Sequence, residues 1–107
     1  MSQTRLELIM DMLEKDPNDP FLLYAVALEY KKIGNFVVAI KQLENLIKSH
    51  PQYLGTYYLL GKLYEESDEV AKAIEIYKKG KIIATSIGDH KILGELNEAL
   101  LLLEEDD

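Results

Sequence analysis

The chain has 107 residues, of which 48% are hydrophobic and 29% charged, and it contains no cysteine. This balance is typical of one soluble globular domain, and the lack of cysteine excludes disulfide frameworks, cysteine-rich zinc sites and thiol nucleophiles. The formal net charge of −7 argues against nucleic acid as a partner, because a protein that neutralises phosphates does so with lysine and arginine. Four of the acids are the last four residues, which we expect to form a solvated helix end.

The chain shows neither a membrane segment nor a signal peptide. No stretch approaches the roughly 18 apolar residues that a membrane span requires. Near the N-terminus, Glu7 and Asp11 interrupt the apolar run and no small-residue cleavage site follows. We therefore expect a cytoplasmic protein that does not bind membranes.

Apolar residues recur at three- and four-residue spacing almost throughout, which predicts an all-α chain. Capping and breaking residues divide it into about six helices. Thr4 and Glu7 match a capping box that opens the first helix, and Asp19 with Pro20 opens the second. The later breaks are expected at Gly34-Asn35, Ser49-His50-Pro51, Ser67-Asp68 and Ile87-Gly88-Asp89.

A 34-residue period runs through the helices. The residue pairs that keep this spacing include Pro17 and Pro51, Tyr30 and Tyr64, Ala39 and Ala73, and Leu43 and Tyr77. A fixed 34-residue period across helix-turn-helix units resembles the tetratricopeptide repeat family. The resemblance implies a single domain over 1–107, folded as a short right-handed α-solenoid of antiparallel helices. Its parts would be a half-repeat helix whose first helix is missing at 3–19, repeats at 20–53 and 54–87, and a capping helix with an acidic tail at 88–107.

Gly61 lies within an apolar helical run, and we interpret it as one of several small residues at which two facing helices approach each other. Ala27 and Gly61 lie on the first helices of the two repeats, and Ala39 and Ala73 lie on the second helices. Gly61 costs roughly 1 kcal/mol of helix propensity relative to alanine, so its presence predicts a close approach of two helices. The alternative is an ordinary antiparallel bundle in which the spacing is coincidental.

The chain departs from the family pattern at a few positions. Leu23 and Tyr57 stand where the family often has tryptophan, and Gly80 replaces the usual alanine. Thr85 stands where the second repeat would carry its closing proline, so we expect the fifth helix to run on towards Ser86.

The last helix is expected to start near Asp89, to end near Glu105 and to cap the second repeat. Its sequence fits the first-helix pattern poorly. The predicted buried stripe consists of Leu93, Leu96, Leu100 and Leu103, and the residues predicted to face water are Glu95, Glu98 and Glu105. The unbroken leucine run over 100–103 is too wide for one helix face, so part of it must be exposed or buried against another molecule.

No residue pattern indicates catalysis, a cofactor or a metal. His50 and His90 lack a metal-ligand neighbour at helical spacing. The carboxylates over 65–69 are interpreted as a solvated turn in which Asp68 caps the fifth helix. Because no nucleophile or base has a visible orienting partner, we expect a protein that is not an enzyme and has no cofactor.

The family resemblance implies that a peptide or partner protein, of unknown identity, binds on the concave face formed by the first helices. The residues expected there are Phe21, Tyr24, Leu28, Lys31 and Lys32 in the first repeat, and Gly55, Tyr58, Leu59, Lys62 and Glu66 in the second. The two tyrosines would grip the peptide, Lys31 and Lys62 would engage carboxylates, and Gly55 would admit its backbone. Alternatively, the last helix or a neighbouring chain covers this face.

One branch of the family holds the carboxylates of chaperone tails with lysine and asparagine on these helices. Here Tyr24, Leu28 and Leu59 occupy those places, so chaperone-tail binding is not expected. A second hypothesis is self-assembly, for example a homodimer, through the terminal helices. It follows from the wide spread of apolar residues around the first helix, namely Leu6, Leu8, Ile9, Met10, Met12 and Leu13.

Overall fold

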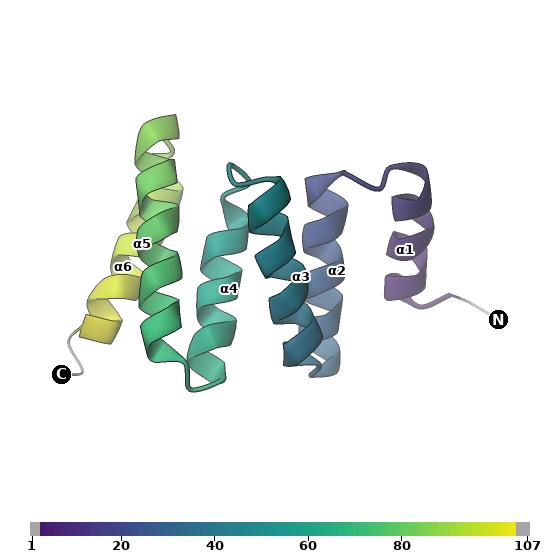
Figure 1. Ribbon diagram of the computed structural model, residues 1–107, viewed down its shortest axis with the longest axis horizontal. Helices are drawn as coiled ribbons and strands as arrows, with labels where there is room; N and C mark the ends of the chain where they lie inside the picture. The colour runs from purple at the N-terminus through teal and green to yellow at the C-terminus, as the bar shows by residue number, and fades with distance from the viewer. Residues whose placement is uncertain (1–2, 105–107) are drawn as a thin grey trace. The chain divides into compact units, whose positions relative to one another are not determined.

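The computed structural model describes residues 3–104, and within this range it contains six α-helices and no strand. They are α1 (Arg5–Lys15), α2 (Pro20–Ile33), α3 (Phe36–Ser49), α4 (Gly55–Glu66), α5 (Val70–Ile87) and α6 (His90–Glu104). The all-α prediction is confirmed. The chain divides into two compact units, with the boundary in the sequence between Pro51 and Gln52. Within each unit, consecutive helices run in opposite directions (Figure 1). The predicted tail over 105–107, with Glu105, lies outside the described residues.

The predicted starts of the first two helices are confirmed. The backbone N–H of Glu7 donates to Thr4 Oγ1 at 3.1 Å, and Glu7 Oε1 accepts from the Thr4 N–H at 3.1 Å. Asp19 Oδ1 accepts from the N–H of Phe21 at 2.9 Å, with Pro20 at the first helical position. These side chains satisfy N–H groups that the first turn of a helix leaves without an intrahelical partner.

Two of the predicted breaks are glycines in the left-handed conformation. Gly34 ends α2 with φ 89°, and Gly88 ends α5 with φ 84°. The next residue in each case caps the following helix: Asn35 Oδ1 accepts from the N–H of Val38 at 3.3 Å, and Asp89 Oδ1 accepts from that of Ile92 at 3.1 Å. The chain thus reverses within two residues at both places.

The interpretation of Asp68 as the cap of α5 is wrong. Glu69 occupies the N-cap position and makes no side-chain capping bond. Asp68 instead adopts a left-handed φ of 59°, which closes the end of α4 so that the N–H of Glu69 donates to the Tyr64 carbonyl at 2.8 Å. Aspartate tolerates this conformation better than most residues, and its side chain is then no longer placed to cap.

In the first unit, α2 packs against both α1 and α3. Ile9 of α1 is buried with Leu22 and Val26 of α2. The small residues Ala27 and Ala39 are fully buried, as expected for helices that approach closely.

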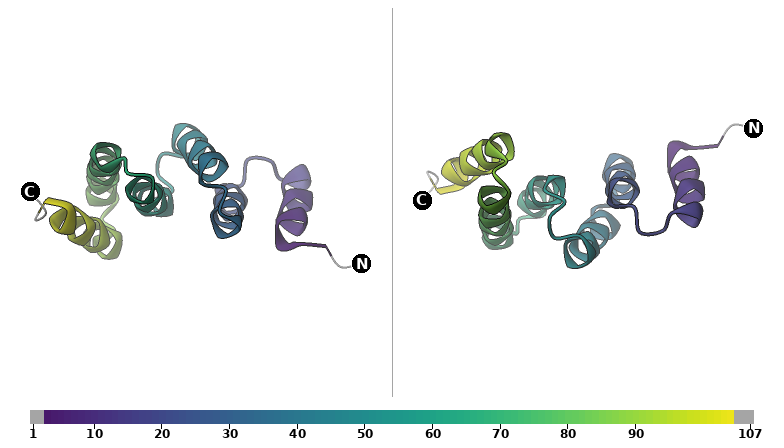
Figure 2. Two further views of the ribbon diagram at one scale, coloured as in Figure 1. Left: turned by 90° about the horizontal axis from the view of Figure 1, so that it is seen from below. Right: turned by 90° about the horizontal axis from the view of Figure 1, so that it is seen from above.

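In the second unit, α5 packs against both α4 and α6, and the two end-on views of Figure 2 show these helices side by side. Gly61 of α4 faces the ring of Tyr77 of α5. A Cβ atom built on Gly61 would lie 2.1 Å from Cε1 of that ring, far inside van der Waals contact. The prediction that Gly61 permits a close helix approach is confirmed, and the group that fills the space is the fully buried Tyr77.

Gly80, which departs from the family pattern, has the same role on α5. A Cβ atom there would lie 2.6 Å from Cβ of Tyr57 on α4 and 3.1 Å from Cδ1 of Leu96 on α6. Tyr57 and Leu96 are both fully buried. Gly80 is therefore the point at which both neighbouring helices approach α5.

The leucines of α6 that were predicted to be buried do face the interior of the second unit. Leu96 and Leu100 are buried and Leu93 and Leu103 are half-buried, whereas Leu101 and Leu102 are 57% and 55% exposed. The prediction that the leucine run exceeds one face is confirmed. Glu98 is exposed as expected, but Glu95 is half-buried rather than facing water freely, because it lies on the side of α6 nearest α4.

The helix α5 extends to Ile87, past the position where a closing proline is missing, as predicted. Thr85 fits within the helix by donating its hydroxyl to the Lys81 carbonyl at 2.8 Å. None of the helices within residues 3–104 combines the length and the apolarity that crossing a membrane requires.

Candidate binding site

The residues of α2 that were predicted to lie on the binding face differ in their exposure to solvent. Phe21 is 63% exposed and Lys32 is exposed, whereas Tyr24, Leu28 and Lys31 are half-buried. Lys32 Nζ lies 3.2 Å from Glu29 Oε2, which is also 3.2 Å from Arg5 Nε of α1. Lys32 is thus paired with a carboxylate of its own helix.

On α4, Tyr58, Lys62 and Glu66 form a stripe at four-residue spacing. Tyr58 is 37% exposed, Glu66 is exposed, and Lys62 and Gly55 are half-buried. Leu59 is only 6% exposed, so the expectation that it is presented to a partner is wrong. The side chain that follows Tyr58 points about a quarter turn away around the helix, and on this helix that direction leads into the protein.

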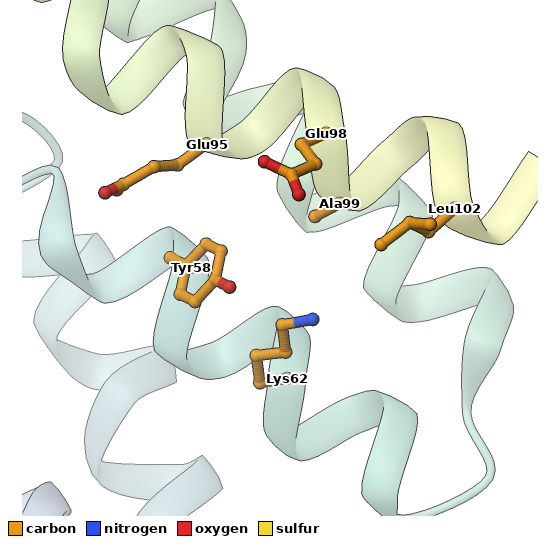
Figure 3. A pocket seen from close by; sticks show the side chains of 6 residues that line it. All are labelled: Tyr58, Lys62, Glu95, Glu98, Ala99 and Leu102. Atoms are coloured by element: carbon orange, nitrogen blue, oxygen red, sulfur yellow. The ribbon is translucent and has the colours of Figure 1, made fainter.

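Tyr58 and Lys62 of this stripe, but not Glu66, form one wall of a hollow of about 80 Å³, and α6 forms the other wall (Figure 3). The lining residues are Tyr58, Lys62, Glu95, Glu98, Ala99 and Leu102. Because Tyr58, Glu98 and Leu102 are exposed, the hollow opens to solvent. The last helix therefore does not cover Tyr58 and Lys62 but extends the surface to which they belong.

Lys62 is held by two neighbours on α4. Its Nζ lies 3.6 Å from Glu65 Oε2 and 5.3 Å from the centroid of the Tyr58 ring. The ring face attracts the ammonium, and the carboxylate compensates its charge. Glu65 also accepts a hydrogen bond from the Tyr77 hydroxyl, so this carboxylate is not part of a fully solvated turn as the sequence suggested.

The Tyr77 hydroxyl has a raised pKa. Burial is the largest cause, followed by the hydrogen bond that the neutral hydroxyl donates to Glu65 and by the negative charge of that carboxylate. The Tyr58 ring lies 6.3 Å from that of Tyr77, centroid to centroid. Tyr77 thus links the close contact at Gly61 with the residues that position Lys62.

The raised pKa of Tyr77 predicts a loss of stability at high pH. The unfolded chain releases this proton near pH ~10, whereas the folded protein retains it, so the free energy of unfolding falls as pH rises above ~10 and is unaffected below it. The contribution of one such group is at most about 1.4 kcal/mol per pH unit. Urea unfolding at several pH values should show a shallower fall for Tyr77→Phe than for the wild type. If the free energy of unfolding fell equally steeply with pH in both proteins, the raised pKa of Tyr77 would be contradicted.

Glu95 and Glu98 give the hollow its charge. Neither carboxylate forms an ion pair with another residue in the range 3–104, whereas Lys62 is compensated by Glu65. The hollow therefore carries uncompensated negative charge beside an aromatic ring. Both residues were predicted only to face water, not to belong to a site. Their three-residue spacing, with Ala99 and Leu102 on the same face, was the available signal.

No group of three or more histidine, cysteine, aspartate or glutamate residues in the described part of the chain is arranged to hold a metal ion. His50 is half-buried and His90 is exposed. The chemical groups at the hollow are thus carboxylates, one compensated ammonium, an aromatic ring and aliphatic side chains.

The chain resembles solved structures with repeat architecture. The tetratricopeptide repeat domain protein from Salinibacter ruber, solved by NMR, is 43% identical, and the match covers 85% of this chain and 92% of that one with a TM-score of 0.81. No family model matches the sequence, and no curated protein matches it. At this identity and coverage, the chain belongs to the tetratricopeptide repeat family.

More distant structures share the fold. A Bordetella parapertussis protein is 24% identical over 99% of this chain and 92% of its own, with a TM-score of 0.85. The TPR2B domain of yeast Sti1, solved in complex with pHsp70, is 16% identical over 95% of this chain and 82% of its own, also with a TM-score of 0.85.

Proposed function

We propose that this protein is a non-catalytic protein-interaction module whose α4–α6 hollow binds a segment of a partner protein. In this proposal α2–α3 and α4–α5 are the two repeats, and α6 supplies the second wall of the site. The observation that carries it is the partly exposed ring of Tyr58 at an open hollow bounded by two helices. Amphipathic aromatic rings in such positions commonly supply binding energy at interfaces.

Two further observations support an interaction role. Among the residues that line the hollow, no nucleophile is hydrogen-bonded to a base. The shared fold in the TPR2B domain of Sti1 accommodates a protein ligand, since that domain was solved with pHsp70. Because the residues of the carboxylate-clamping branch are absent from this chain, the proposal does not extend to chaperone tails.

The proposal predicts that Tyr58→Ala abolishes capture of a partner that the wild type retains from a lysate of the source organism. Binding of the purified partner, measured by calorimetry, should weaken at least tenfold, because the variant removes the exposed ring but not the buried core. Ile82→Ala is the matched control, since Ile82 is exposed on the outer face of α5. Retention of the partner by Tyr58→Ala with unchanged affinity would refute the α4–α6 site.

Self-association through the terminal helices is a second candidate. It is favoured by the exposed apolar residues of these helices, namely Leu8, Met10, Met12, Leu101 and Leu102. Exposed apolar groups in proximity often mark an interface. Sedimentation at increasing protein concentration decides this question: a rising mass supports self-association, and a constant monomer mass excludes it.

A further inference from the structure

The hollow has an unusual charge arrangement for a surface expected to bind carboxylates. Its one cation, Lys62, is already paired with Glu65 at 3.6 Å and lies over the Tyr58 ring. Its two other charged residues, Glu95 and Glu98, are acids without an ion pair within residues 3–104. A carboxylate that entered the hollow would meet these two acids, and the charge of Lys62 is already compensated by Glu65. A cation would meet two free carboxylates.

We infer that the α4–α6 hollow selects a lysine or arginine side chain of the partner segment. The inference rests on the proposed function and specifies the ligand chemistry of the same site. The ammonium or guanidinium group pairs with Glu98, and Glu95 adds negative charge at the same hollow. The aliphatic stem lies along Tyr58, Ala99 and Leu102, which line the hollow too. Long basic side chains bury their methylene groups against apolar surface in this way while their charged end is paired.

The size of the hollow agrees with a single side chain. Pockets for complete small-molecule ligands are typically about 300–1,000 Å³, whereas this one is about 80 Å³. It is open on the solvent side, as the exposure of Tyr58, Glu98 and Leu102 shows. A peptide backbone can therefore pass outside while one side chain enters. Positive charge lies at a different hollow, on α5, which is lined by Lys78 and Lys81 together with Ile82 and Thr85.

Selection of random twelve-residue peptides displayed on phage against the whole chain tests the inference. The expected result is a set of peptides enriched in lysine or arginine, whose binding is lost with Tyr58→Ala. In fluorescence anisotropy, a synthetic peptide from this set should bind Glu98→Lys about tenfold or more weakly, and Glu98→Gln should fall between that variant and the wild type. Glu75→Lys, an equal change of charge on α5, should stay within about twofold.

The outcomes separate the inference from the proposed function. Peptides that require Tyr58 but are acidic, or lack a charge preference, would overturn the choice of a basic ligand and leave the binding site in place. Peptides that bind Glu98→Lys as tightly as the wild type would also overturn it. If no selected peptide requires Tyr58, the proposed function fails and the inference fails with it.

Discussion

Gly61→Ala is expected to reduce the free energy of unfolding by about 3 kcal/mol, at the upper end of the cost of overpacking a core. The added methyl group would lie 2.1 Å from the ring of Tyr77, a fully buried side chain that cannot move aside into solvent. The gain of about 1 kcal/mol in helix propensity does not offset this clash. Urea unfolding followed by circular dichroism measures the effect.

Gly94→Ala is the matched control for this prediction. Gly94 also lies within a helix, but nothing lies within 4 Å of a Cβ atom placed there. That variant should be neutral or up to about 1 kcal/mol more stable than the wild type. In a Tyr77→Leu background, Gly61→Ala should cost much less, because the clashing ring is gone. A cost that does not depend on residue 77 would show that Gly61 is needed for another reason.

Leu96→Ala is expected to cost about 2–5 kcal/mol and to abolish partner binding. Leu96 is fully buried and lies beside Gly80, where α6 meets α5. The truncation leaves a cavity under α6, the helix that carries Glu95 and Glu98 into the hollow. Amide hydrogen exchange should therefore show that α6 loses protection before α4 does.

Leu101→Ala is the control for the α6 prediction, because Leu101 lies on the same helix but is exposed to solvent. Its free energy of unfolding should stay within about 0.5 kcal/mol of that of the wild type, with binding retained. Unchanged binding by Leu96→Ala, with α6 shown to be loosened, would mean that α6 is not a wall of the site.

The local structure of the chain could be predicted from short-range chemistry. The cap at Thr4, the left-handed glycine at Gly34 and the close approach at Gly61 each depend on a few neighbouring residues or on the 34-residue period. Gly80 could only be identified as a departure from the family pattern, because the reason for it is a contact with Tyr57 and Leu96 on two other helices.

The site was predictable only in part, because it also depends on contacts between helices that lie apart in the sequence. The stripe of Tyr58 and Lys62 follows from the helical period of α4. The prediction for Leu59 was wrong because this residue, next to Tyr58 in the sequence, was assumed to be exposed as well. Its side chain points in another direction, and packing decides whether that direction leads to solvent or into the protein. The contribution of Glu95 and Glu98 depends on how α6 docks in the second unit, which no local pattern specifies.

The central claim, that a partner segment binds in the α4–α6 hollow, is tested most directly by an NMR titration of the isotope-labelled chain with a basic peptide from the phage selection. We predict that the largest shifts of the backbone amide signals occur at Tyr58, Lys62, Glu98 and Leu102. Shifts concentrated around Ile82 and Thr85 on the outer face of α5, with the hollow unaffected, would contradict it.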